Sequence, residues 1–158
     1  SDYLEARRGE DIVIGCGNRR YRPVGEQLAG WLKEEYDITA RLTTAGPRAS
    51  TNYTYMSGFG WTRYGDNPVE ADILVGNDQS NGLMWKFADC KDWVHWLPVE
   101  VNKDFPGLGH AIVMLSLPIR TRANGQPGGR SAPQHLIIGA GNPADAMRGV
   151  EALQKGLR

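Results

Sequence analysis

The residues best suited to bind a ligand follow three short apolar segments, each of which ends in glycine and asparagine. The segments are Ile14-Gly15-Cys16-Gly17-Asn18, Val75-Gly76-Asn77-Asp78 and Ile138-Gly139-Ala140-Gly141-Asn142. In an open α/β sheet, ligands bind beyond the carboxyl ends of the strands. The pattern therefore predicts a candidate site for a nucleotide, a phosphorylated metabolite or a sugar, lined by Asn18, Arg19, Arg20, Asn77, Asp78 and Asn142.

The same residues have a purely structural interpretation. Glycine permits a tight turn, and asparagine caps the helix that follows, so the three turns need no ligand. Arg19, Arg20 and Arg22 precede a predicted helix N-terminus, where backbone N–H groups favour an anion. Both interpretations stay open at the level of sequence.

A dinucleotide site is not expected, although residues 139–144 match the glycine fingerprint by letter. The fingerprint requires a strand–helix–strand unit and an acidic residue about 20 positions later. The chain ends at Arg158, with no segment left for the second strand.

No catalytic or metal-binding motif is evident. His95, His110 and His135 lack partners at ligand spacing, and a nucleophile elbow of the G-x-S-x-G type is absent. Cys16 and Cys90 match no zinc or redox spacing, and we expect two free thiols. We therefore expect no catalytic residue, metal or cofactor, although sequence cannot exclude a triad assembled from distant positions.

Two long connections are candidates for contacts with a partner. Residues 50–66 combine aromatic side chains with glycine and small polar residues, a composition that suits protein interfaces and also stacks on sugars. Residues 118–133 are basic and rich in turn residues, and Asn124-Gly125 indicates a projecting hairpin. The predicted interface residues are Tyr53, Tyr55, Phe59, Trp61, Tyr64, Arg120, Arg122 and Arg130. The alternatives are an aromatic flap packed on its own domain and a solvent-exposed basic loop.

The charges favour self-association over nucleic-acid binding. The chain carries 18 basic and 18 acidic side chains, so its net charge is zero. Little net repulsion opposes contact between copies, whereas phosphate binding requires a concentrated positive field. Residues 64–104 are acidic and residues 105–158 are basic, which allows one copy to pair with another. No apolar run reaches the roughly 20 residues that span a bilayer.

The pattern of elements predicts one α/β domain over residues 1–158. Apolar, β-branched segments predict strands, and apolar positions at helical spacing predict helices. The predicted strands are 11–15, 38–44, 71–76, 110–117 and 135–139, with an ambiguous extended segment at 92–101, and the predicted helices are 23–36, 80–90 and 143–155. This order indicates a three-layer fold, with a mainly parallel sheet of about five strands and helices on both faces. The connection at 118–134 allows one antiparallel pair.

Several of these segments together resemble a known class of domains. They are Ile12–Gly15, Pro23–Leu32, Ala71–Gly76, Phe105–Met114, Leu136–Asn142 and Ala146–Leu153. Their order is similar to flavodoxin-like or Rossmann-like accessory domains of S-layer proteins and other large secreted envelope proteins. The opening strand and helix also resemble N-terminal domains of some glycoside hydrolases. The resemblance implies a structural or carbohydrate-adjacent role, an extracellular or cell-envelope location and no catalytic residues.

From these features we expect a non-catalytic domain that associates with itself or with other envelope proteins, with carbohydrate as a further partner. A cytoplasmic location stays open, because sequence does not separate the two compartments. The alternative function is a small-molecule binding protein or enzyme that uses the carboxyl edge of the sheet.

Overall fold

The protein contains a five-stranded sheet with the strand order β2-β1-β3-β5-β4. The computed structural model describes residues 2–44, 71–77, 80–81, 106–115 and 135–156. Strands β2, β1, β3 and β5 are parallel, and β4 pairs with β5 in the antiparallel direction. The bounds are β1 Asp11–Cys16, β2 Thr39–Thr44, β3 Ile73–Gly76, β4 Ala111–Leu115 and β5 Leu136–Ala140.

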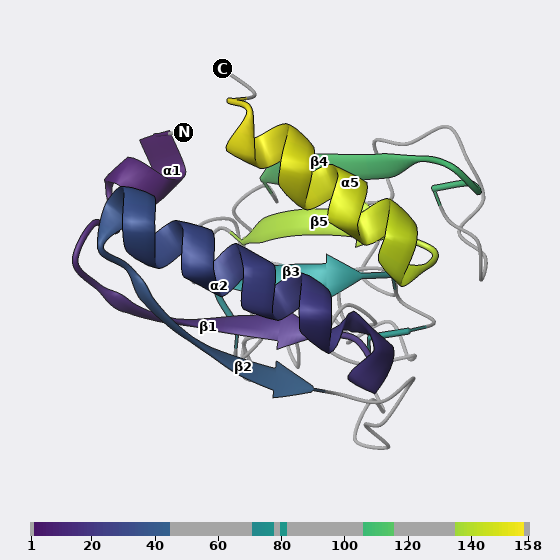
Figure 1. Ribbon diagram of the computed structural model, residues 1–158, viewed down its shortest axis with the longest axis horizontal. Helices are drawn as coiled ribbons and strands as arrows, with labels where there is room; N and C mark the ends of the chain where they lie inside the picture. The colour runs from purple at the N-terminus through teal and green to yellow at the C-terminus, as the bar shows by residue number, and fades with distance from the viewer. Residues whose placement is uncertain (1, 45–70, 78–79, 82–105, 116–134, 157–158) are drawn as a thin grey trace, which may run out of the picture.

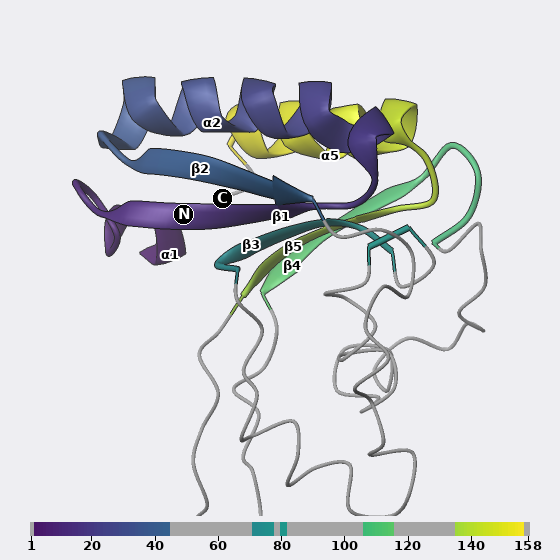
Figure 2. The same cartoon turned by 90° about the horizontal axis from the view of Figure 1, so that it is seen from below.

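Two long helices cover one face of this sheet. They are α2, Arg22–Tyr36, and α5, Pro143–Gln154, and they lie side by side along the strands (Figure 1). The short helix α1, Asp2–Glu5, lies on the opposite face (Figure 2). The predicted α/β class, with a mostly parallel sheet and one antiparallel pair, is confirmed.

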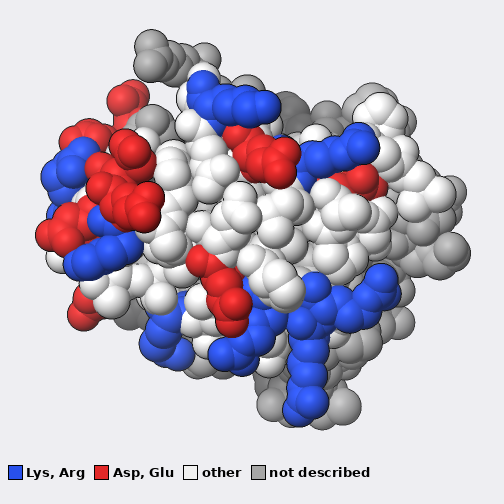
Figure 3. All heavy atoms as spheres, in the orientation of Figure 1, with Lys and Arg blue, Asp and Glu red and all other residues white. Residues whose placement is uncertain are grey.

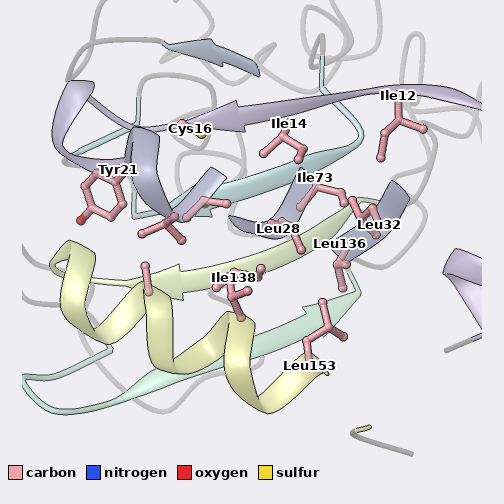
Figure 4. Packing of buried hydrophobic residues seen from close by; sticks show 14 of the residues in the cluster. Ile12, Ile14, Cys16, Tyr21, Leu28, Leu32, Ile73, Leu136, Ile138 and Leu153 are labelled. Carbon is pink, nitrogen blue, oxygen red and sulfur yellow. The ribbon is translucent and has the colours of Figure 1, made fainter. Parts of the chain in front are cut away.

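The core lies between the two long helices and the sheet. Leu28 and Leu32 from α2 and Leu153 from α5 point toward Ile14, Ile73 and Ile138 of the central strands (Figure 4). Strands β3 and β5 are buried along their whole length, which explains their continuous apolar sequence. β2 lies at the edge of the sheet and is only partly buried, in agreement with its alternating polar sequence.

Helix α2 begins and ends where local chemistry requires. Pro23 occupies its first turn, where a missing N–H costs nothing. At the other end Asp37 adopts a left-handed conformation with φ 53°, and its N–H donates to the carbonyls of Leu32 and Lys33. Such a residue stops a helix and satisfies its last carbonyl groups.

Glycines let both helices approach the sheet closely. A Cβ atom at Gly25 of α2 would lie 2.6 Å from Leu42 Cδ2 and would also clash with Cys16 Sγ. A Cβ atom at Gly149 of α5 would lie 2.8 Å from Ile138 Cγ2. The absence of these two side chains therefore sets the distance between the helix layer and the strands.

Most predicted boundaries agree with the structure to within two residues. Two short elements were not predicted: α1, and the 3-10 helix η1 at Arg19–Tyr21. The predicted helix 80–90 beyond its first two residues, the extended segment 92–101, the connections at 50–66 and 118–133, and Cys90 lie outside the described residues. Cys16 is buried as a free thiol, and burial raises its pKa to about 11. In the described part of the chain, no helix combines the length and apolar character needed to cross a bilayer.

Candidate functional site

The structure brings the three predicted turns to one edge of the sheet. Strands β1, β3 and β5 are neighbours and run parallel, so Asn18, Asn77 and Asn142 all follow carboxyl ends at this edge. We call this edge, with its turns at 17–18, 77–81 and 141–142, the rim. Asp78, the one acidic residue among the six of the predicted site, lies outside the described residues.

Asn18 closes the first turn of the rim. Its Oδ1 accepts a hydrogen bond from the N–H of Arg20 at 3.0 Å and so caps η1. Its carbonyl accepts from the N–H of Tyr21 at 3.0 Å. The asparagine therefore acts here as the helix cap of the structural interpretation.

Asn77 and Ser80 close the second turn reciprocally. Asn77 Oδ1 accepts from the N–H of Ser80 at 3.0 Å, and Ser80 Oγ accepts from the N–H of Asn77 at the same distance. The N–H of Asn81 donates to the Asn77 carbonyl at 2.8 Å. This is the capping-box arrangement. The helix predicted to follow, to about residue 90, lies outside the described residues.

Asn81 joins two strands at the rim and was not identified from sequence. Its side chain is completely buried, and Nδ2 donates to the carbonyls of Gly15 and Val75, each at 2.9 Å. A single amide group thus ties the end of β1 to the end of β3. No sequence pattern predicts it, because Gly15 is 66 positions away.

Asn142 closes the third turn together with a buried carboxylate. Its Oδ1 accepts from the N–H of Asp145 at 2.9 Å, and its Nδ2 donates to Asp145 Oδ2 at 2.8 Å. The same Oδ2 accepts from the N–H of Gly109 at 2.9 Å. Asp145 therefore fastens the segment before β4 to the start of α5, where the helix dipole favours a negative charge.

The arginines of the predicted site are placed differently from its asparagines. Arg19 and Arg20 are exposed, and within the described part of the chain neither forms an ion pair. Tyr21 between them and α2 is buried, and burial raises the pKa of its hydroxyl, against the opposing effect of a hydrogen bond with Ser80. The rim thus has an interior of capped turns and two exposed arginines that form no ion pair with the described residues.

A second polar cluster lies at the opposite edge, where β1, β3 and β5 begin. Asp72 Oδ2 accepts from the N–H of Val13 at 2.9 Å, and Oδ1 contacts Arg7 Nη1 at 3.2 Å. The Tyr3 hydroxyl donates to the Asp72 carbonyl at 3.0 Å, and the Arg7 guanidinium lies 4.5 Å from the centre of the Tyr3 ring. Asp72 is partly buried, because it anchors α1 to the sheet.

His135 belongs to this second cluster. Its Nδ1 lies 2.6 Å from the Ala71 carbonyl, and the ring is buried. Burial lowers the pKa of the imidazole, while the Ala71 carbonyl and the charge of Asp72 act in the opposite direction. These contacts give the imidazole a role in holding β5 beside β3.

The pKa of His135 predicts a loss of stability in mild acid. The unfolded chain binds a proton near the ordinary pKa of 6.5, whereas the folded chain does so only at lower pH. The stabilisation from neutral His135 is therefore complete above pH 6.5 and declines as the pH falls below it. The free energy of unfolding, measured in urea, should fall less between pH 8 and pH 5 in His135→Asn than in the wild type. In His110→Asn, at an exposed position, the free energy of unfolding should fall as much as in the wild type. An equal fall in the wild type and both variants would contradict the role given to His135.

In the described residues, no group of three or more histidine, cysteine, aspartate or glutamate side chains could hold a metal ion. The predicted interface residues in 53–64 and 120–130 lie outside the described part. Comparisons of the chain with protein-family models, with curated proteins and with solved structures gave no match. The chemistry of the chain must therefore be inferred from its own residues.

Proposed function

We propose that this chain is a non-catalytic interaction domain that self-associates within an extracellular or cell-envelope assembly. The main support for the proposal is that the rim side chains form hydrogen bonds within the fold. At the edge where an open α/β sheet would bind a ligand, Asn18, Asn77 and Asn142 each cap a turn of the fold itself. Asn81 is likewise committed to the carbonyls of two strands.

Two titratable side chains that are buried or partly buried support the same proposal. Tyr3 and Cys16 have pKa values raised by burial to about 12 and about 11, so both stay protonated at neutral pH. An acid, base or nucleophile for catalysis needs a pKa near the working pH, or an activating neighbour. These groups instead stabilise the core and the edge that holds α1.

Light scattering over a range of protein concentrations tests the proposal. We expect the average mass to rise with concentration, because the net charge is zero and the predicted contact segments, 50–64 and 118–133, are aromatic and basic. Replacing Tyr53, Phe59 and Trp61 by serine should reduce this rise while leaving the fold intact by circular dichroism. A strict monomer at every concentration would refute self-association.

A second function is favoured by one observation: Arg19 and Arg20 at the rim are exposed, and no ion pair joins them to another described residue. An anionic small molecule such as a sugar phosphate or nucleotide would find two guanidinium groups beside the start of α2. A ligand at 100 times its dissociation constant stabilises a protein by about 2.7 kcal/mol. A thermal-shift screen with such compounds, in the wild type and in Arg19→Gln/Arg20→Gln, therefore tests this alternative. A shift lost in the variant would support it, and no shift with any compound would refute it.

A further inference from the structure

Helix α2 carries its charges in the reverse of the arrangement that stabilises a helix. Arg19 and Arg20 immediately precede it, Arg22 begins it, and its first turn contains no acidic residue. Glu34 and Glu35 lie in its last turn. Because the N-terminus of a helix is partially positive and the C-terminus partially negative, both groups of charges oppose the dipole.

The segments next to α2 extend this separation. The Arg8 guanidinium donates to the Glu35 carbonyl at 3.2 Å, and the N–H of Gly9 donates to the Tyr36 carbonyl, so residues 8–11 lie beside the end of α2. The N–H of Thr39 donates to the Glu10 carbonyl at 3.0 Å, so Glu10 and Asp11 lie just beyond this contact. Arg7, Arg8 and Lys33 lie at the same end, each paired with an acidic side chain. In the view of Figure 3, acidic side chains gather where α2 ends, with basic side chains interleaved among them, and basic side chains gather toward the end where it begins.

Some of these charges are neutralised locally and others are not. Arg22 pairs with Glu26 at 3.0 Å, and Lys33 pairs with Asp37 at 2.6 Å. Within the described part of the chain, Arg19 and Arg20 at one end and Asp11, Glu34 and Glu35 at the other form no ion pair. All five are exposed. We call the first pair the basic end and the other three the acidic end.

We propose that copies of this chain associate head to tail, with the basic end of one copy against the acidic end of the next. This inference rests on the self-association in the proposed function, and it adds the two ends of α2 as a further contact surface with a second copy as the partner. The partner is a second copy, because the same molecule carries both complementary patches. In the contact, the acidic residues of one copy approach the positive end of the neighbour's α2. That contact satisfies the charges which oppose the dipole in the isolated chain.

Head-to-tail contacts are heterologous, so they continue from copy to copy and form rings or filaments. The contact is also electrostatic and exposed. Salt at about 1 M, where the screening length is about 3 Å, should therefore weaken it strongly.

The test uses charge reversal at each end separately and then at both. We expect Arg19→Glu/Arg20→Glu and Glu34→Arg/Glu35→Arg each to weaken self-association at least about tenfold in sedimentation experiments, because like charges then meet across the contact. Neither change should lower the melting temperature, since each now agrees with the helix dipole. An equimolar mixture of the two variants, and the chain that carries all four changes, should associate like the wild type.

The outcomes separate this inference from the proposed function. If the wild type associates and both variants associate equally well, the head-to-tail contact is refuted while self-association stands. Failure of the mixture to associate would also refute the contact, because the two reversed patches remain complementary. A wild type that stays monomeric at all concentrations would overturn both proposals.

Discussion

Asn81→Asp is expected to destabilise the protein by about 2–4 kcal/mol, because a buried amide donor becomes an acceptor that faces two carbonyl groups. In the native chain Asn81 Nδ2 donates to the carbonyls of Gly15 and Val75 at 2.9 Å, inside a fully buried site. The change preserves side-chain volume and leaves no cavity, so the loss combines the two missing hydrogen bonds with the burial of a carboxylate. Domain stabilities are commonly about 5–15 kcal/mol, so the loss should be obvious in urea unfolding.

The control makes the same chemical change elsewhere in the rim. Asn18 acts through its Oδ1, which accepts from the N–H of Arg20. Aspartate performs that role as well as asparagine, so Asn18→Asp should leave the free energy of unfolding nearly unchanged. Similar losses in the two variants would show that Asn81 is not the donor that joins β1 to β3.

Gly25→Ala and Gly30→Ala, in the same helix, are expected to change stability in opposite directions. A Cβ atom at Gly25 would overlap Leu42 and Cys16, whereas one at Gly30 meets nothing within 4 Å. Overpacking costs about 1–3 kcal/mol, and alanine in place of glycine contributes about 1 kcal/mol to a helix. The gain in helix propensity is common to both variants, so the free energy of unfolding of Gly30→Ala should exceed that of Gly25→Ala by about 1–3 kcal/mol.

A further variant separates overlap from other effects at Gly25. Cys16→Ala removes the sulfur atom that a Cβ at position 25 would meet. The combination Gly25→Ala/Cys16→Ala should therefore be less destabilised than the sum of the two single changes. Additive losses would indicate that α2 does not pack against β1 as closely as described.

Elements with a local cause were predictable from sequence. The apolar segments of β1, β3 and β5 carry their strand signal within a few residues, and α2 carries apolar positions at helical spacing together with Pro23. Helix α1 has no such signal. It is four residues long and lies on the sheet where Arg7 contacts Asp72 and Tyr3 donates to the Asp72 carbonyl. Its existence depends on contacts about 65–69 positions away, which a local pattern does not contain.

In the candidate site, too, features with a local cause were predictable and features that depend on distant contacts were not. Glycine and asparagine after each strand predicted the turns and their common edge, but left both capping and ligand binding as possible roles for the asparagines. Contacts three residues later decided the role of Asn77 and Asn142, and a contact 66 positions away revealed Asn81. The arrangement of charges was also only partly predictable, because residues 1–63 sum to a net charge of +1. That sum conceals the separation of basic and acidic residues along α2, which only the fold reveals.

Hydrogen exchange measured in dilute and in concentrated protein tests the central proposal most directly, because it locates contacts between copies. We expect amides in 50–64 and 118–133 to exchange more slowly in the concentrated sample, while those of β3 and β5 stay unchanged. Exchange that is independent of concentration throughout the chain would contradict a domain that works by associating with itself.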